Sequence, residues 1–140
     1  MRPTASFLSG ALPLALIAAM AFTAQPAAAR NASPEAKLAK AIEGRVAGEP
    51  VDCLYLRDIR SSRIIDDTAI LYETAGGTLY VNRPRSGETS LDSRDVMITD
   101  THSPRLCNID VVRLVESSTF MQTGFVMLGD FVPYRKPPRP

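Results

Sequence analysis

The fold of this chain is decided by Thr68-Ala-Ile-Leu-Tyr-Glu-Thr-Ala-Gly-Gly-Thr-Leu-Tyr-Val-Asn82, in which two β-rich runs flank a glycine pair. The two glycines tolerate the positive φ angles of a two-residue type I′ turn, so the sequence predicts a β-hairpin over residues 68–84. Such a turn places Ala75 opposite Thr78 and Tyr72 opposite Val81, and in this register one face is apolar and the other is mixed. The apolar face carries Ile70, Tyr72, Leu79 and Val81, and the mixed face carries Leu71, Glu73, Tyr80 and Asn82. We therefore expect an antiparallel sheet with one side on a core and one side largely in water.

Further β-rich runs lie on both sides of this hairpin. They are Val51–Ile59, Asp95–Thr99, Val111–Glu116 after an approach over Leu106–Asp110, and Phe125–Val132 with a bulge or bend at Gly129-Asp130. Short strands separated by turns predict an all-β (mainly β) fold. We expect a small antiparallel barrel or sandwich of about five to six strands, preceded by one short α-helix.

The helix is expected at the start of the mature chain. Ser33 fits the N-cap position, Pro34 the first helical position and Glu35 the first turn. Gly48 and Pro50 are expected to end the helix. The apolar residues that recur between these ends at four-residue spacing are Leu38, Ile42 and Val46. This narrow stripe predicts a helix that packs on the sheet.

Residues 1–29 have the pattern of a secretory signal peptide. A short basic start at Arg2 precedes an apolar run over Phe7–Phe22, and small residues follow. Ala27-Ala28-Ala29 predicts cleavage between Ala29 and Arg30. A membrane anchor is the weaker alternative, because the run is about 16 residues and a membrane span needs roughly 20. The sequence thus predicts export to the periplasm, with no membrane span after cleavage.

The mature chain is expected to form one small domain. Residues 30–50 form an N-terminal segment with the helix, 51–134 the β-domain and 135–140 a disordered proline-rich tail. From Pro133 onward the chain is too proline-rich to pair with a strand. The leader holds one of the 16 basic residues and none of the 15 acidic ones, so the mature net charge is zero. This balance argues against nucleic acid as a partner.

Cys53 and Cys107 are the only cysteines. In an exported chain an even count predicts a disulfide, and the periplasm is oxidising. The loop it would close has about 55 residues, for which chain entropy gives on the order of 4 kcal/mol of stabilisation. A redox-active pair is the alternative, but the short Cys-x-x-Cys spacing that lowers a thiol pKa is missing.

Acidic residues in two loops are the candidates for chemistry. Asp66 and Asp67 precede the hairpin, and Asp92 and Asp95 lie on either side of Arg94. Carboxylate pairs of this kind serve acid-base hydrolysis when they face one another across a cleft. Aspartates in loops also cap turns or stay solvated, so both interpretations remain open at this point.

The sequence contains a single histidine, His102, in a loop. A zinc site would need it together with scattered carboxylates, without paired-ligand spacing. A serine hydrolase would need it as a base, but no Gly-x-Ser-x-Gly turn is present. No phosphate loop, dinucleotide-binding glycine pattern or calcium loop is found either. No metal or other cofactor is predicted.

The order of four short segments resembles an uncharacterised family of short exported bacterial proteins that is known only as a domain of unknown function. The segments are Cys53–Ile59, Ile65–Asp67, Leu106–Asp110 and Leu128–Phe131, and the resemblance covers roughly Val51 to Tyr134. Members often carry two further cysteines, at positions that match Glu88 and Val126 here. The resemblance implies that those two form a second disulfide and that Cys53 and Cys107 form the first. It implies fold and compartment, and no catalytic residue.

Taken together, these features predict a non-enzymatic periplasmic accessory or binding module, whose partner is an unknown envelope protein or ligand. The expected contact surface is Tyr80 on the mixed hairpin face, with Arg83 and Arg85 after it. One alternative is a small cell-envelope hydrolase that uses the loop carboxylates. Another is a ligand or metal carrier, which would need an apolar cavity or a cluster around His102.

Overall fold

The computed structural model describes residues 32–138, which form one α-helix followed by ten strands in three antiparallel sheets. The predicted mainly-β fold with a preceding helix is therefore confirmed, with more and shorter strands than expected. None of the three sheets closes into a barrel within these residues. The predicted leader, its cleavage between Ala29 and Arg30, and the last two residues of the tail lie outside the described residues.

The elements follow one another along the chain as short pieces. They are α1 (Pro34–Ile42), β1 (Val46–Ala47), β2 (Cys53–Tyr55), the 3-10 helix η1 (Leu56–Asp58), β3 (Ile59–Ile65), β4 (Ala69–Thr74), β5 (Leu79–Asn82), the 3-10 helix η2 (Glu88–Ser90), β6 (Asp95–Thr99), β7 (Arg105–Cys107), β8 (Val111–Glu116), β9 (Gln122–Met127) and β10 (Phe131–Arg135). The five-stranded sheet has the order β1-β10-β5-β4-β3, the two-stranded sheet pairs β2 with β7, and the three-stranded sheet has the order β6-β8-β9.

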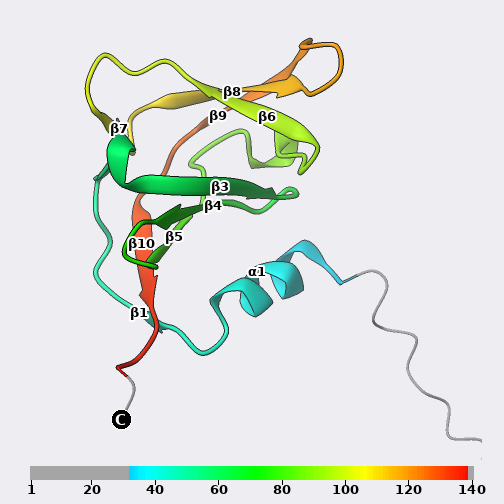
Figure 1. Ribbon diagram of the computed structural model, residues 1–140. Coiled ribbons are helices and arrows are strands. Elements are labelled where there is room, and N and C mark those ends of the chain that lie inside the picture. The colour runs from blue at the N-terminus through cyan, green and yellow to red at the C-terminus, as the bar shows by residue number, and fades with distance from the viewer. Residues whose placement is uncertain (1–31, 139–140) are drawn as a thin grey trace, which may run out of the picture.

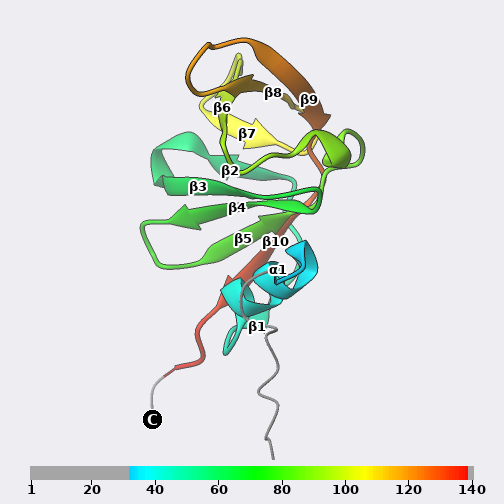
Figure 2. The ribbon, with the colours of Figure 1, turned by 90° about the vertical axis from the view of Figure 1, so that its right-hand side faces the viewer.

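The molecule is layered, with the five-stranded sheet in the middle. Figures 1 and 2 show the three-stranded sheet on one side of it and α1 on the other. The core between the two sheets includes Ile70, Val112, Leu128 and Phe131, all fully buried. Between the helix and the five-stranded sheet lies a smaller core, in which Leu38 is the buried side chain of α1. Two cores therefore share one central sheet.

The predicted register of the central hairpin is wrong by one residue. Tyr72 lies opposite Tyr80 rather than opposite Val81. The loop has three residues instead of two: the Gly77 N–H donates to the Thr74 carbonyl at 2.9 Å, and Gly77 takes the left-handed φ of 75°. A Gly-Gly pair serves either a two-residue turn or a three-residue loop that ends in a left-handed glycine. Local sequence therefore did not choose between them.

This one-residue slip changes which side chains share a face. Ile70 and Tyr72 point into the core between the sheets. There the ring of Tyr72 packs edge to face against that of Phe131, with 5.7 Å between the ring centroids. Leu79 and Val81 point the other way, into the core under α1. The prediction that one face of the hairpin is exposed to solvent is therefore wrong. Both faces of the hairpin are buried, because a helix covers one and a second sheet covers the other.

Replacing Gly77 with alanine should destabilise the protein by about 1 kcal/mol, because a Cβ in the left-handed region costs that much. Gly76 is the matched control: its φ is not positive, and both positions have open space around a Cβ. We therefore expect Gly76→Ala to leave the midpoint of urea unfolding almost unchanged. Equal effects of the two substitutions would contradict the three-residue loop.

The helix begins as predicted and ends early. The Ser33 hydroxyl accepts a hydrogen bond from the Ala36 N–H at 3.3 Å, with Pro34 in the first turn. The helix stops at Ile42, before the predicted end at Gly48, because Gly44 adopts a left-handed φ of 69° just beyond it. Val46 therefore lies in β1 and is 63% exposed, so the predicted packing stripe loses its last member.

Two strand predictions are wrong at their ends. The run Val51–Ile59 divides into β2, the 3-10 helix η1 and the first residue of β3. The rest of β3 was missed because its polar Arg60-Ser-Ser-Arg63 segment lacks an apolar pattern.

The C-terminal tail, which was predicted to be unpaired, pairs with other strands as far as Arg135. Pro133 lies opposite Tyr80, and its carbonyl accepts a hydrogen bond from the Gly48 N–H at 2.8 Å. A proline removes one donor and leaves its carbonyl free to pair.

The predicted last strand, Phe125–Val132, is also two strands. β9 belongs to the three-stranded sheet and β10 to the five-stranded sheet. The chain crosses between them at Leu128–Asp130, where a bend was expected. The buried Asn82 side chain holds this crossing: its Nδ2 donates to the Gly129 carbonyl at 2.6 Å, and its Oδ1 accepts from the Gly129 N–H at 3.1 Å. One side chain thus fixes the route of the chain from one sheet to the next.

Candidate functional site

A polar, open hollow of about 670 Å³ lies at one end of the molecule, between the loop after η2 and the end of the three-stranded sheet. The carboxylates that line it are Asp66, Asp67, Asp92, Asp95 and Glu116. Four of these are the aspartates that the sequence proposed for chemistry. Glu116 was missed, because it ends a predicted strand and no nearby motif marks it.

Strand ends and turns bring these acidic residues together. Asp67 adopts a left-handed φ of 50° in the turn between β3 and β4, and its N–H donates to the Leu91 carbonyl at 3.1 Å. This hydrogen bond joins the hairpin turn to the loop after η2. Asp95 begins β6 and lies opposite Glu116 at the end of β8. The acidic groups therefore come from three parts of the chain that only the tertiary fold makes neighbours.

Most of these carboxylates already have hydrogen-bond partners. Asp66 accepts from the Ser93 N–H at 2.7 Å and from Lys37 Nζ at 3.1 Å. Asp92 accepts from the backbone and guanidinium of Arg94, at 2.9 and 3.0 Å. Asp95 accepts from the Thr123 hydroxyl. The hollow is thus lined by carboxylates that are held in place.

These partners keep three of the carboxyl groups ionised. Hydrogen bonds from the Arg94 side chain lower the pKa of Asp92 to about 2, and hydrogen bonds from Thr119 and Ser118 lower the pKa of Glu116 to about 2. Hydrogen bonding from Ser93 lowers the pKa of Asp66. A general acid needs a pKa raised toward the working pH. These three groups lack that property, which weakens the hydrolase interpretation.

The Glu116 carboxylate should stabilise the folded protein, and this stabilisation should be lost at acid pH. Its pKa is lower in the folded protein than its ordinary value of 4.5, so its contribution is complete above pH 4.5 and is lost as the pH falls toward 2. We expect Glu116→Gln to reduce the fall in Tm between pH 4.5 and pH 2. The control is Glu88→Gln, at a carboxylate that accepts no hydrogen bond among residues 32–138. Identical Tm profiles for the wild type and Glu116→Gln would contradict this assignment.

His102 is exposed in the loop between β6 and β7. Among residues 32–138, no three histidine, cysteine, aspartate or glutamate side chains are grouped so that they could hold a metal ion. The structure therefore places no ligand cluster around His102.

The three residues of the predicted contact surface point to different places. Tyr80 is half-buried and packs against the core between the two sheets. Arg83 makes a paired contact with the Glu35 carboxylate of α1 at 2.8 and 2.9 Å, and Arg85 pairs with Asp130 at 3.3 Å. Both ion pairs are exposed, so each contributes little to stability. Arg83 and Arg85 are therefore held by different elements, and their joint role with Tyr80 as a contact surface stays a prediction.

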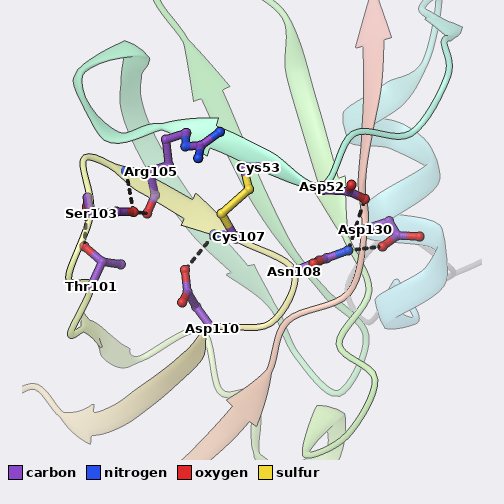
Figure 3. Close-up of a disulfide and its surroundings, with 9 residues drawn as sticks. All are labelled: Asp52, Cys53, Thr101, Ser103, Arg105, Cys107, Asn108, Asp110 and Asp130. Carbon is purple, nitrogen blue, oxygen red and sulfur yellow. Dashed lines mark hydrogen bonds between the residues drawn. A yellow bond between two sulfur atoms is a disulfide. The ribbon is translucent and has the colours of Figure 1, made fainter.

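The predicted disulfide between Cys53 and Cys107 is confirmed, and the two Cα atoms are 4.0 Å apart. Figure 3 shows the bond crossing from β2 to β7, where the two residues lie directly opposite each other. The Asn108 side chain donates to Asp52 at 3.2 Å and to Asp130 at 2.7 Å beside it. The bond therefore joins the two short strands β2 and β7 to each other, which is a structural role.

The positions that match the further cysteines of the resembled family lie on contacting elements. Glu88 begins η2, and Val126 lies in β9. At Gly87, the residue before Glu88, a Cβ would come within 3.1 Å of the Val126 Cα. This proximity agrees with the pairing that the resemblance implies, which stays a prediction.

An exposed apolar surface on the three-stranded sheet was missed in the sequence. We call it the outer face, and it is the side of the three-stranded sheet turned away from the core. Its large apolar residues are Val96, Val111, Phe125 and Met127, each at least 43% exposed. Arg113 lies among them, opposite Phe125 and Ile98. The signal in the sequence is the unbroken apolar run Phe125-Val-Met127, which has no polar residue for a wet face.

Within residues 32–138, no helix is long and apolar enough to cross a membrane. No protein-family model matches the chain, and no curated protein or solved structure is significantly similar to it. The resemblance to a family of exported bacterial proteins therefore stays a prediction. The outer face and the hollow are the features that bear on function.

Proposed function

We propose that this chain is exported to the periplasm and works there as a non-enzymatic binding module, with the outer face of the three-stranded sheet as its contact surface. The observation that carries the proposal is the exposure of that face: Phe125 is 57% exposed, and Val111 and Met127 lie beside each other at 43%. Contiguous exposed apolar side chains mark interaction sites. Aromatic residues, methionine and arginine are the types enriched at protein interfaces.

Export is supported by two independent features. The first 29 residues have the charge, apolar run and small residues of a signal peptide. The mature domain carries a disulfide, which forms and persists in oxidising compartments. The two features agree, because a secretion signal leads a chain into a compartment where its disulfide persists.

An enzyme and a carrier are less well supported. The hollow gathers the carboxylates that a hydrolase would use, but hydrogen bonds lower the pKa of Asp66, Asp92 and Glu116, so these three offer no proton donor near neutral pH. A small-molecule carrier would use a mainly apolar cavity. This hollow is open and lined with charged groups. Binding through the outer face is the function that the geometry supports best.

Photo-crosslinking in the producing cell tests the contact surface. A photoreactive phenylalanine analogue replaces Phe125 in one variant and Lys40, an exposed residue of α1 on the opposite side of the molecule, in the control. We expect irradiation to give a discrete adduct at position 125 and none at position 40. The same adducts at both positions, or none at position 125, would overturn the proposal.

Export is tested separately by intact mass. Protein recovered from the envelope fraction is alkylated with and without prior reduction. We expect a chain that begins at Arg30 and takes up two labels only after reduction. A full-length chain, or free thiols before reduction, would remove the case for a periplasmic disulfide-bonded module.

A further inference from the structure

The turn between β8 and β9 presents two large apolar side chains at its tip, and the acidic hollow begins at its base. We infer that this end of the molecule binds a segment of a partner protein that carries both basic side chains, lysine or arginine, and leucine-like apolar ones. The inference rests on the proposed binding function and names the chemistry of the partner.

The tip is firmly built. The Glu116 carboxylate accepts hydrogen bonds from the N–H and hydroxyl of Ser118, at 3.2 and 2.7 Å, and from those of Thr119, at 2.8 and 2.7 Å. The main chain closes the turn, because the Phe120 N–H donates to the Glu116 carbonyl and the Glu116 N–H donates to the Met121 carbonyl, both at 2.9 Å. A turn held in this way loses little conformational freedom on binding.

The side chains at the tip do not serve the turn itself. Phe120 is 72% exposed and Met121 is 69% exposed. Phe120 also adopts a left-handed φ of 56°, a conformation that asparagine or glycine takes more readily than an aromatic residue. An exposed aromatic ring on a strained backbone position suits an anchor that inserts into an apolar site. Figure 1 shows this hairpin projecting, in orange, from one end of the three-stranded sheet.

The base of the same hairpin is acidic. Glu116 ends β8 and lines the hollow together with four aspartates, and Arg94 is the one basic residue among the described residues that line it. Arg94 is itself paired with Asp92. A partner that covers the tip therefore meets negative charge beside it, so a basic segment complements this end of the molecule.

The negative charge also indicates whether the partner is a protein or a membrane. An apolar tip on an anionic surface would be repelled by the negative surface of a membrane that contains acidic lipids. The arrangement of an apolar anchor next to carboxylates therefore favours a basic protein segment.

Fluorescence anisotropy with labelled synthetic peptides tests the inference. The probes are a ten-residue alternating Lys-Leu peptide, its Glu-Leu counterpart and a Lys-Ser peptide. We expect the Lys-Leu peptide to bind at least tenfold more tightly than either of the others. Vesicles that contain phosphatidylglycerol are expected not to sediment the protein. Equal binding of the Glu-Leu peptide, or sedimentation with the vesicles, would overturn the inference.

Variants locate the binding to this end of the molecule. Phe120→Asn removes the ring at a position where asparagine tolerates the backbone, and Asp95→Asn removes a charge from the hollow; each should weaken Lys-Leu binding at least tenfold. The control is Ile109→Asn, at an apolar residue 75% exposed on the loop between β7 and β8, which should bind like the wild type. Equal losses in Phe120→Asn and Ile109→Asn would overturn the inference. If crosslinking at position 125 succeeds while the peptide-binding measurements fail, the binding function is retained and only the proposed chemistry of the partner is rejected.

Discussion

Replacing Cys53 and Cys107 together with alanine should lower the free energy of unfolding by up to about 4 kcal/mol, the value that chain entropy gives for a loop of this length. The bond spans 54 residues of sequence, so its loss frees a large part of the unfolded chain. β2 and β7 have three residues each and pair only with each other. A sheet this short is not stable by itself, and we expect its pairing to loosen in the variant.

Urea unfolding followed by circular dichroism measures this effect. The control is the wild type in the presence of a reducing agent, which should unfold at the same urea concentration as the double variant. Agreement between them would show that the loss comes from the bond rather than from the alanine side chains. A double variant as stable as the oxidised wild type would contradict the bracing role of the disulfide.

Replacing Asn82 with alanine should cost about 3 kcal/mol, the second large effect that we expect. Asn82 is fully buried, and its side chain both donates to and accepts from the backbone of Gly129. Alanine would leave a buried N–H and a buried carbonyl of Gly129 without partners, and each such group costs roughly 1–3 kcal/mol. Hydrogen exchange at the Gly129 amide should accelerate in the same variant.

Asn108→Ala is the matched control for this prediction. Asn108 also uses its side chain for two hydrogen bonds, to Asp52 and Asp130, but at an exposed site. In the variant, water can donate to Asp52 and Asp130 in place of the Asn108 side chain. We therefore expect the free energy of unfolding to fall by less than about 1 kcal/mol. Similar losses at Asn82 and Asn108 would show that burial does not set the difference.

Asn82 also explains a feature of the topology. Its two hydrogen bonds fix the crossing at Leu128–Asp130, where the chain leaves the three-stranded sheet and enters the five-stranded one. Gly129 is needed there because a Cβ would lie 2.2 Å from the Arg83 carbonyl oxygen. Gly129 was recognised in the sequence as a bend. Asn82, whose side chain fixes this bend, was instead predicted to lie on the face of the hairpin that is exposed to water.

The candidate site was only partly visible in the sequence. The four aspartates were found because acidic residues beside turns are a recognisable pattern, and the structure brings them to one hollow. Glu116 was missed because its role depends on the turn that follows it. Tyr80 was chosen from a predicted register, with Arg83 and Arg85 because they follow it, and the one-residue shift turned the half-buried Tyr80 side chain toward the core between the two sheets.

What the sequence determined by itself was local. The Ser33 cap, the β-rich runs and the pairing of the two cysteines follow from short-range chemistry or from a count of two. The tertiary structure decided the hairpin register, the burial of both hairpin faces and the pairing of Pro133. These depend on which surfaces meet, and contacts between residues far apart in the chain contribute more free energy than the local preference of a Gly-Gly turn.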